Sequence, residues 1–222
     1  TCPTKDLLSY LKKENIFNTD KIFYLQDAII NIHDYIKKIN ENDEAFLNKV
    51  KKHDHYFLAV GRLTKQKNYP YLITEFIDYL KIEKDAVLLI IGDGEEKDTL
   101  TGLIRENYLS NNVFILNDII NVYPFMKKAR ALILASLWEE VGFVIVEAAF
   151  CNLFVISSDC QNGPKEFLEN GEAGYLFQSN IKNELTKKIQ DFARAEKNLK
   201  KLKIKAKKNS SNYTLFRHHL SL

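Results

Sequence analysis

The chain has 222 residues, 45% of them hydrophobic, which is enough to bury a sizeable core in one large or two small domains. The formal net charge of +3 is too small for the footprint of a nucleic-acid-binding protein. No apolar stretch approaches the roughly 20 residues that cross a bilayer, and the chain starts without a basic-then-apolar signal pattern. These features predict a cytoplasmic globular protein without a nucleic-acid partner.

The cysteines and histidines show no pattern of metal binding. Cys2, Cys151 and Cys160 are odd in number and form no C-x-x-C pair, so neither a disulfide framework nor a zinc site is predicted. The five histidines lack the spacing of zinc motifs, and His53 and His55 are interpreted as loop or strand-entry residues. We therefore expect no metal site.

Short apolar runs alternate with amphipathic stretches through the middle of the chain. The apolar runs predict five strands, at residues 56–60, 86–91, 113–116, 131–135 and 154–157. Apolar residues at helical spacing predict helices at residues 68–80, 95–107, 122–129, 144–150, 164–169 and 181–194. This alternation predicts an α/β fold, a Rossmann-like, doubly wound parallel sheet with helices on both faces.

The two ends of the chain do not fit this alternation. Residues 1–44 are predicted to hold a helix at 6–13 and a strand-like run at 22–25, and they end in an acidic, linker-like segment. The alternating unit covers residues 45–194, and residues 195–222 are predicted to form a basic, helical tail.

The tail concentrates positive charge. Seven lysines lie within residues 197–208, interleaved with Leu199, Leu202 and Ile204. A basic amphipathic stretch of this kind fits contact with an anionic membrane surface, and it also fits a solvated terminal helix.

Doubly wound sheets bind ligands beyond the carboxyl ends of their strands, so the loops at those ends are the candidate site. The loop after the first strand carries Gly61, Arg62 and Lys67. A guanidinium fork and an ammonium group suit a diphosphate, whose oxygens accept charge-assisted hydrogen bonds. Taken alone, the same residues also fit a solvated turn.

The loop after the fourth strand carries two carboxylates, Glu139 and Glu147. On one continuous helix they would point about 80° apart, so Glu139 is predicted to lie in the loop and Glu147 in the helix. Gly142 permits close backbone approach at the helix start, where amides bind phosphate oxygens. A carboxylate in the first turns can hold a ribose diol, and an acidic helix start favoured by the macrodipole is the alternative.

The other two loops carry weaker signals. Gly92 and Gly94 lack the third glycine of a dinucleotide-binding fingerprint, and a tight strand-to-helix turn is the favoured interpretation. Ser157 and Ser158 could line a polar site, although capping and turn chemistry is favoured for them.

Four segments, in order and spacing, resemble the C-terminal, nucleotide-sugar-binding domain of glycosyltransferase family 4, the retaining enzymes of GT-B fold. They are FLAVGRLTKQKN, LLIIGDGEEKDTL, ALILASLWEEVGFVIVEAAFCN and VISSDCQNGPKEFLENGEAGYLF, and together they cover roughly residues 56–177. Each motif is weak alone, and their combination carries the resemblance.

The resemblance implies roles for residues of both loops. Arg62 and Lys67 match the family's phosphate-binding pair, and Glu139 and Glu147 match its two glutamates separated by seven residues. Glu139 would then contact the donor sugar, and Glu147 would accept hydrogen bonds from the ribose. The expected catalytic residues are Glu139, Arg62 and Lys67. The expected donor-binding residues are Gly61, Arg62, Lys67, Gly142, Phe143, Val144 and Glu147.

The resemblance also implies a reaction. A hexosyl group would pass, with retention, from a nucleoside-diphosphate sugar to a glycan or lipid-linked acceptor in surface polysaccharide or glycoconjugate synthesis. A UDP-sugar is favoured over GDP- and ADP-sugars, and neither a metal nor another cofactor is implied.

The resemblance assigns residues 1–44 to the end of an N-terminal domain and the interdomain linker. In the family, that domain supplies most of the acceptor site. We therefore expect this chain alone to bind nucleotide weakly and to transfer no sugar. Peripheral contact of the tail with the inner membrane face is the accompanying hypothesis.

Three positions depart from the family pattern. Glu140 and Asn152 stand where glycines are usual, and Val141 stands where an aromatic residue is usual. These changes leave the backbone shape near the transferred sugar open. Two alternatives also stay open: a GT-B-fold nucleotide-sugar epimerase, which would need no acceptor, and a non-catalytic nucleotide-binding module.

Overall fold

The computed structural model describes residues 1–15, 17–41 and 55–221 and contains a wholly parallel, six-stranded sheet. The strands are β1 (Tyr56–Val60), β2 (Val87–Ile91), β3 (Val113–Leu116), β4 (Ala131–Leu134), β5 (Phe154–Ser158) and β6 (Tyr175–Phe177). The α-helices are α1 (Lys5–Lys13), α2 (Ile32–Lys38), α4 (Tyr69–Leu80), α5 (Lys97–Glu106), α6 (Tyr123–Lys128), α7 (Phe143–Phe150), α8 (Pro164–Phe167), α9 (Glu184–Arg194), α10 (Glu196–Ser210) and α11 (Leu215–Leu220). The 3-10 turns are η1 (Thr19–Lys21), η2 (Lys65–Lys67), η3 (Glu169–Gly171) and η4 (Ser211–Tyr213).

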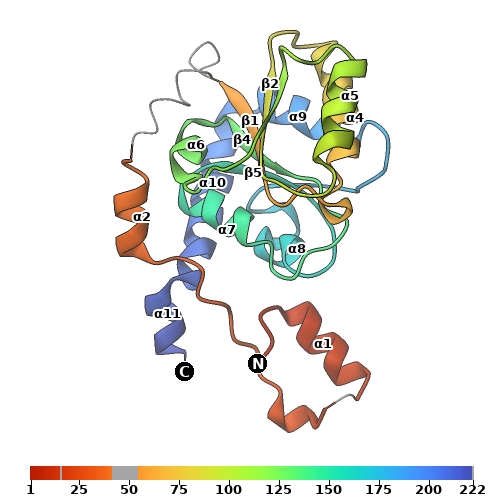
Figure 1. Cartoon of the computed structure of the whole chain (residues 1–222). Helices are drawn as coiled ribbons and strands as arrows, with labels where there is room; N and C mark the ends of the chain where they lie inside the picture. The colour runs from red at the N-terminus through yellow and green to blue at the C-terminus, as the bar shows by residue number, and fades with distance from the viewer. Residues whose placement is uncertain (16, 42–54, 222) are drawn as a thin grey trace.

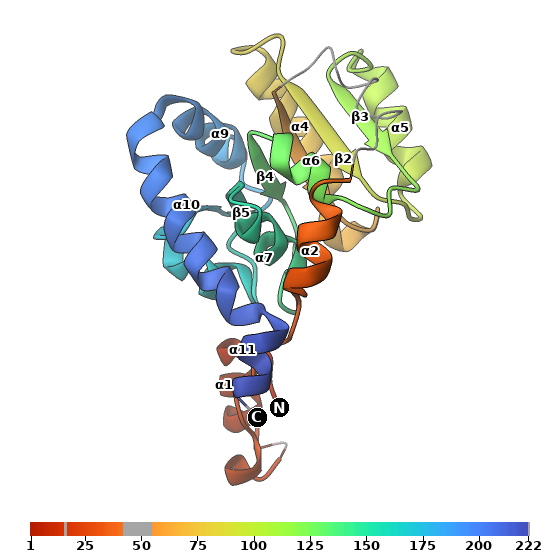
Figure 2. The same cartoon turned by 90° about the vertical axis from the view of Figure 1, so that its left-hand side faces the viewer.

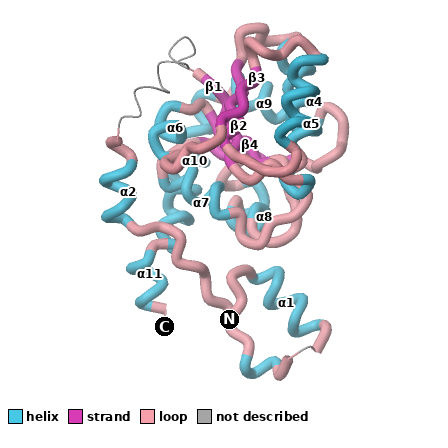
Figure 3. The backbone as a smooth tube through the Cα atoms, in the orientation of Figure 1, coloured by secondary structure: helices cyan, strands magenta, loops and turns pink. Residues whose placement is uncertain are grey.

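Helices cover both faces of the sheet, as the uninterrupted apolar runs predicted (Figures 1 and 3). Phe57 and Ala59 of β1 belong to a core shared with α4, α5 and α9. Tyr56 and Leu58 of the same strand belong to a second core shared with α6, α7 and Ala206 of α10. These strand residues are nearly inaccessible, and each large apolar side chain buried in this way stabilises the fold by about 1.5–3 kcal/mol.

The strand order, β3-β2-β1-β4-β5-β6, reverses direction beside β1. β1 pairs in parallel with β2 on one side and with β4 on the other. The chain therefore leaves β1 and β4 toward opposite faces of the sheet, which opens a crevice between the two loops that follow them. This topology brings together the two loops that were singled out in the sequence.

The five predicted strands are confirmed to within one residue at each end. The sheet has a sixth strand, β6, which pairs with β5 from Ile156↔Tyr175 onward and was not predicted. A three-residue edge strand is too short to show the alternation that identifies strands in a sequence.

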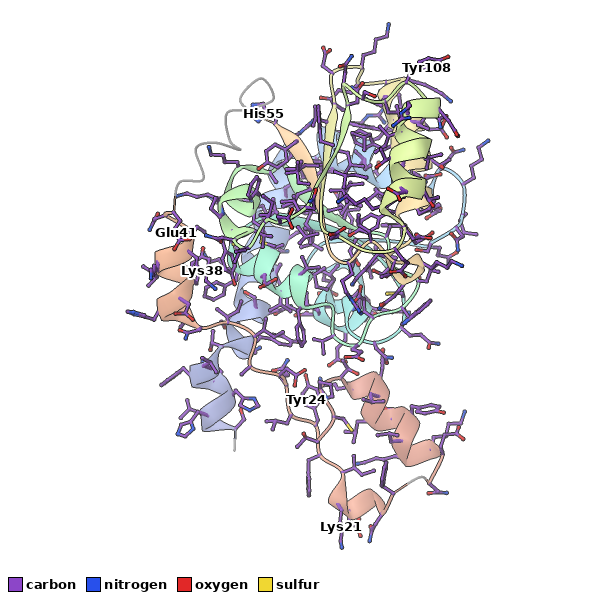
Figure 4. All side chains as sticks on the ribbon, viewed as in Figure 1. Lys21, Tyr24, Lys38, Glu41, His55 and Tyr108 are labelled. Carbon is purple, nitrogen blue, oxygen red and sulfur yellow. The ribbon has the colours of Figure 1, made fainter. Side chains whose placement is uncertain are left out.

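The strand predicted at residues 22–25 is wrong. Tyr24 forms an isolated bridge with Cys2, in which the Cys2 amide donates to the Phe23 carbonyl at 2.7 Å and the Leu25 amide donates to the Cys2 carbonyl at 3.0 Å. The bridge joins the two ends of a segment that contains α1 and η1 and projects away from the sheet domain, with Lys21 near its far end (Figure 4). A single bridge between neighbouring chain segments provides no ladder and thus no strand.

The two ends of the chain meet beside the sheet domain. The amides of Ile29 and Ile30 donate to the Tyr213 carbonyl at 2.8 and 2.9 Å, and the Leu215 amide donates to the Ile30 carbonyl at 2.9 Å. The predicted tail helix is present as α10, which runs along the side of the domain to α11 (Figure 2). The helix α2 was not predicted, whereas α11 lies within residues 195–222, which were predicted to form a helical tail. Within the described residues, no helix is both long and apolar enough to cross a membrane.

The turn after β2 supports the loop after β1. The Leu63 amide donates to the Asp93 carbonyl at 2.8 Å, and the Glu96 amide donates to the Leu63 carbonyl at 2.9 Å. A Cβ atom on Gly92 would lie 1.9 Å from the carbonyl oxygen of Gly61. The predicted tight turn is confirmed, and its glycine also allows the close approach that holds the loop in place.

We expect Gly92→Ala to destabilise the domain, because the added methyl group collides with backbone that cannot move independently. Gly102→Ala is the matched control: Gly102 lies in α5 with nothing within 4 Å of the added Cβ, and alanine is favoured over glycine in a helix by roughly 0.5–1 kcal/mol. Thermal unfolding should give a lower Tm for Gly92→Ala and an equal or higher Tm for Gly102→Ala. Equal Tm values for the two variants would contradict this account of the turn.

Candidate functional site

A cavity of about 440 Å³ opens at the carboxyl edge of the sheet, between the loops after β1 and β4. Every residue predicted from the sequence to bind or transform a donor lines it. The lining residues are Val60, Gly61, Arg62, Gln66, Lys67, Trp138, Glu139, Glu140, Val141, Gly142, Phe143, Val144 and Glu147. The sheet topology thus gathers residues 61–67 and 138–147 into one site.

A partly buried ion pair spans the crevice. The Lys67 Nζ atom lies 2.6 Å from Glu139 Oε1, and the side chains are 14% and 7% exposed. Ser136 donates its hydroxyl to the same carboxylate oxygen at 2.5 Å. Because burying charges costs solvation, this second hydrogen bond helps to offset the cost of holding Glu139 ionised. The Lys67 ammonium has three donors and needs one for Glu139, so it can also bind an anion in the cavity.

Gln66 fastens the same two loops together. Its side-chain Nε2 donates to the Trp138 carbonyl at 2.8 Å, and its own carbonyl accepts from the Leu137 amide at 2.8 Å. Sequence analysis missed this residue, because a glutamine in a polar loop has no distinctive spacing. It neighbours Lys67 in η2, so its contacts help to fix the position of the ammonium group.

Arg62 presents an exposed guanidinium group at the cavity, next to Gly61. The Gly61 carbonyl accepts a hydrogen bond from the buried Tyr69 hydroxyl at 3.1 Å. The Tyr69 hydroxyl therefore fixes the backbone at Gly61, while the side chain of Arg62 is available to contact a ligand. An exposed arginine beside this backbone suits a group that carries several anionic oxygens.

The start of α7 provides neutral donors at the cavity. Gly142 is the N-cap, with φ 76° and ψ 53°, a left-handed conformation that glycine adopts without steric cost. No side chain caps the helix, so the amides of Phe143 and Val144 keep their hydrogen-bonding capacity. Amides at a helix start favour an anion, and here they lie on the same cavity as Arg62 and Lys67.

Glu147, one turn further into α7, lies in a less polar environment. Burial raises the pKa of its carboxyl group, whereas a hydrogen bond from Tyr123 and the charge of Lys38 lower it. The Tyr123 hydroxyl donates to Glu147 Oε1 at 3.3 Å. Lys38 lies at the C-terminal end of α2 (Figure 4), so the segment before the sheet domain contributes to the electrostatics of the site.

Tyr123 is itself held by the segment before the sheet domain. The ring of Tyr35 in α2 contacts those of Tyr123 and Phe150 edge-on, at centroid distances of 5.4 and 4.8 Å. Asn121 donates to the Lys38 carbonyl at 2.8 Å. These contacts place α2 against α6 and α7, and thereby fix the tyrosine that orients Glu147.

The three departures from the family pattern leave the turn intact. Val141 is 2% exposed and packs in the core beneath the cavity, while Glu140 is exposed at its rim. Asn152 has φ 60°, the left-handed conformation that asparagine adopts more readily than most non-glycine residues.

The serines after β5 support the site from outside the cavity. Ser157 and Ser158 are fully buried, and the Ser158 hydroxyl donates to the Ser136 carbonyl at 2.7 Å. Neither serine lines the cavity, so the interpretation of these residues as structural is the one that the contacts support.

The structure gives no support for nucleophilic or metal chemistry in the part of the chain that it describes. Burial raises the pKa of the Cys151 thiol to about 12 and that of the Cys160 thiol to about 11, which disfavours the reactive thiolate. Outside the segments that cannot be described, no group of three or more His, Cys, Asp or Glu residues is placed to hold a metal ion. His53 lies outside the described residues, and His55 is exposed at the entry to β1.

The parallel sheet and the crevice beside β1 define a Rossmann-like α/β domain, with a cavity lined by charged side chains and a helix start at its carboxyl edge. Residues 40–209 match the family model of glycosyl transferases group 1. The chain belongs to this family.

Curated relatives carry related names. The chain is 39% identical over 129 residues to the uncharacterized glycosyltransferase MJ1059 of Methanocaldococcus jannaschii, covering 58% of this chain and 32% of that protein. It is 32% identical over 154 residues to N-acetylgalactosamine-N,N'-diacetylbacillosaminyl-diphospho-undecaprenol 4-alpha-N-acetylgalactosaminyltransferase of Campylobacter jejuni, covering 69% of this chain and 41% of that protein. The chain therefore spans less than half the length of these two relatives.

Solved structures share the fold. A glycosyltransferase from Rickettsia africae superposes with a TM-score of 0.82 at 20% identity, covering 99% of this chain and 60% of that one. Anabaena Alr3699/HepE in complex with UDP-glucose superposes with a TM-score of 0.83 at 17% identity, covering 99% of this chain and 61% of that one. At these identities the likeness establishes the Rossmann-like architecture seen in GT-B glycosyltransferases.

The raised pKa of Glu147 predicts a pH-dependent effect of Glu147→Gln. Between the unfolded pKa near 4.5 and the higher folded pKa, the folded chain holds a proton that the unfolded chain has lost, so stability falls as pH rises through this window. Glutamine does not ionise, so the variant avoids this fall in stability. The fall amounts to about 1.4 kcal/mol for each unit by which folding raises the pKa of Glu147. The stability advantage of Glu147→Gln should be small at pH 4 and larger at pH 8, as measured by urea unfolding. An advantage that does not grow with pH would contradict burial as the dominant influence on Glu147.

Proposed function

We propose that this chain is the donor-binding half of a retaining glycosyltransferase. The enzyme would transfer a hexosyl group from a nucleoside-diphosphate sugar to a glycan or lipid-linked acceptor in surface polysaccharide or glycoconjugate synthesis. The observation that carries the proposal is the single cavity in which Arg62, Lys67, an uncapped helix start and two glutamates meet. UDP is the favoured nucleotide, because the fold is shared with a protein whose solved structures hold UDP and UDP-glucose.

Each part of the cavity has a role in binding the donor. Arg62, the two free donors of Lys67 and the amides of Phe143 and Val144 would bind the diphosphate oxygens. Glu147 would accept hydrogen bonds from the ribose hydroxyls, in the orientation that Tyr123 gives it. The second oxygen of Glu139, which does not bear the Lys67 and Ser136 contacts, would accept from a hydroxyl of the donor sugar.

The same groups would accelerate transfer. As the bond between the anomeric carbon and the diphosphate oxygen breaks, the departing diphosphate gains negative charge. Arg62, Lys67 and the helix-start amides stabilise that charge from positions fixed before the reaction, which is electrostatic catalysis. The acceptor hydroxyl would attack from the side that the diphosphate leaves and give its proton to a phosphate oxygen, so the anomeric configuration is retained. The cations of the protein would serve where other enzymes use a metal.

The acceptor is assigned to a part of the enzyme outside this chain. The donor cavity faces outward at the sheet edge, and the chain spans less than half the length of the two curated relatives named above. We place the acceptor site mainly in an N-terminal domain and assign residues 1–44 to its end and to the linker. This chain alone would then bind nucleotide weakly and transfer no sugar. A cytoplasmic location with peripheral membrane contact through α10 completes the proposal.

We expect Lys67→Met to weaken UDP binding by about tenfold or more, since a charge-assisted hydrogen bond contributes roughly 1.5–3 kcal/mol. Lys65→Met is the matched control: Lys65 is an exposed lysine of η2 that does not line the cavity. Isothermal titration calorimetry with UDP should show unchanged affinity for the control.

Because Lys67→Met leaves Glu139 buried without its cation, a second variant separates stability from binding. The double variant Lys67→Met/Glu139→Gln should regain most of the lost stability and still bind UDP weakly. Equal UDP affinities for wild type, Lys67→Met and Lys65→Met would contradict the proposal that the diphosphate binds in this cavity.

Product analysis of a longer form that includes the N-terminal domain separates the three candidate functions. A transferase gives a glycosylated acceptor with the anomeric configuration of the donor, an epimerase gives a new nucleotide sugar without acceptor, and a binding module gives no product. For the transferase we expect Glu147→Ala to raise the KM for the donor at least tenfold, because two ribose hydrogen bonds are lost. An unchanged donor KM would exclude Glu147 from ribose binding.

A further inference from the structure

A second cavity lies at the opposite edge of the sheet from the candidate donor site. Its volume is about 340 Å³, and it is formed where α10 crosses the amino ends of β4 and β5. Its lining residues are Arg130, Asn152, Phe154, Phe192, Leu199, Lys200, Lys203 and Ile204. Three of these are cations, one is an amide, and none is a carboxylate.

Lys203 lines this cavity without an ion-pair partner among the side chains that the structure describes. Lys203 is half-buried, and burial lowers its pKa because its ammonium group is partly removed from water. None of the ion pairs found among the described residues includes Lys200 or Lys203. By contrast, Lys205 of the same helix pairs with Glu169 and Glu172 at 2.6 and 2.5 Å. The cavity therefore includes one cation, Lys203, for which the described side chains provide no counter-ion.

Arg130 forms the floor of the cavity and is held rigidly. Its guanidinium carbon lies 5.0 Å from the centroid of the Phe57 ring and 5.9 Å from that of Phe192, and its Nη1 atom lies 3.0 Å from Glu83 Oε1. One carboxylate and two ring faces leave other guanidinium N–H groups available to a ligand. An arginine that lines the same cavity as Lys200 and Lys203 matches the donor requirements of a tetrahedral oxyanion.

The face of α10 around Ile204 also carries positive charge. Ile204 is 58% exposed, and it is flanked on the helix by the exposed residues Lys200, Lys201, Lys207 and Lys208. Residues three and four apart share one face of a helix, so these lysines surround the isoleucine. Figure 2 shows α10 along the outer side of the domain.

We propose that this basic cavity binds a phosphate group, either a free phosphate ester or the headgroup of an anionic phospholipid. Lys200, Lys203 and Arg130 contact the phosphate oxygens, and Asn152 donates to an uncharged oxygen. Leu199 and Ile204 contact the apolar part of a lipid where the source is a membrane. The inference is independent of the proposed sugar transfer, and it gives the proposed membrane contact a defined site.

The test compares two charge-matched double variants of α10. Lys200→Gln/Lys203→Gln removes the cavity lysines, and Lys201→Gln/Lys208→Gln removes two exposed lysines of the same helix that do not line the cavity. Glutamine keeps the hydrophilic character and most of the volume of the side chain. Because Lys203 is half-buried without a partner, its replacement should leave Tm equal or higher in the absence of ligand, so loss of folding is not the expected outcome.

Two arms identify the source of the phosphate. In the first, Tm is followed against inorganic phosphate and glycerol 3-phosphate at constant ionic strength with chloride. In the second, sedimentation is measured with phosphatidylcholine vesicles that contain phosphatidylglycerol. We expect the cavity variant to bind about tenfold more weakly than wild type in at least one arm, and the control variant to bind nearly as wild type. Loss in the vesicle arm alone assigns the site to lipid, and loss in the first arm assigns it to a free phosphate ester.

Equal behaviour of the two double variants in both arms would overturn the proposal, because the effect would then belong to the overall charge of α10. Absence of binding by wild type in both arms would overturn it as well. UDP affinity, measured on the same proteins, should be unchanged in the cavity variant. Failure of the donor-site proposal would thus appear separately from failure of this one.

Discussion

The Lys67–Glu139 ion pair is the contact on which the arrangement of the site depends. It joins the loop after β1 to the loop after β4 at 2.6 Å, across the crevice that the strand order creates. A pair this buried is stable only where further hydrogen bonds satisfy its members, and Ser136 provides one to Glu139. Gln66 adds two hydrogen bonds between the same loops, so the ammonium group is held at a fixed place before any ligand arrives.

The buried serines behind this pair explain why the loop after β4 can hold a carboxylate at all. Ser158 donates to the Ser136 carbonyl at 2.7 Å, and the Ser179 hydroxyl donates to the Ala135 carbonyl at 3.1 Å. These bonds satisfy backbone oxygens that would otherwise be buried without partners, where each would cost about 1–3 kcal/mol. The polar residues at the ends of β4, β5 and β6 thus stabilise a loop whose exposed face carries the chemistry.

Much of this could be predicted from the sequence, and the limits have physical causes. Residues 61–67 and 139–147 follow apolar runs, and strand ends in a parallel sheet meet at one edge, so the cavity follows from the order of elements. Gln66 and Tyr123 could not be found in this way, because their roles depend on loop contacts and on the packing of α6 beside α7. The edge strand β6 and the isolated bridge of Tyr24 depend on pairing with a separate chain segment, which the periodicity of a short run of residues does not reveal.

The two ends of the sheet differ in how their charges are balanced, and this difference separates their functions. At the carboxyl edge, Lys67 is paired and Glu147 is half-buried beside Tyr123, so the cavity combines positive and negative groups as a ligand with both phosphates and hydroxyls requires. At the amino edge, Lys200 and Lys203 line a cavity without any carboxylate. A cavity lined by three cations and one amide can bind an anion, but it lacks a lining carboxylate to orient sugar hydroxyls. The amino-edge cavity therefore suits attachment to a phosphate, and the carboxyl-edge cavity suits recognition of a nucleotide sugar.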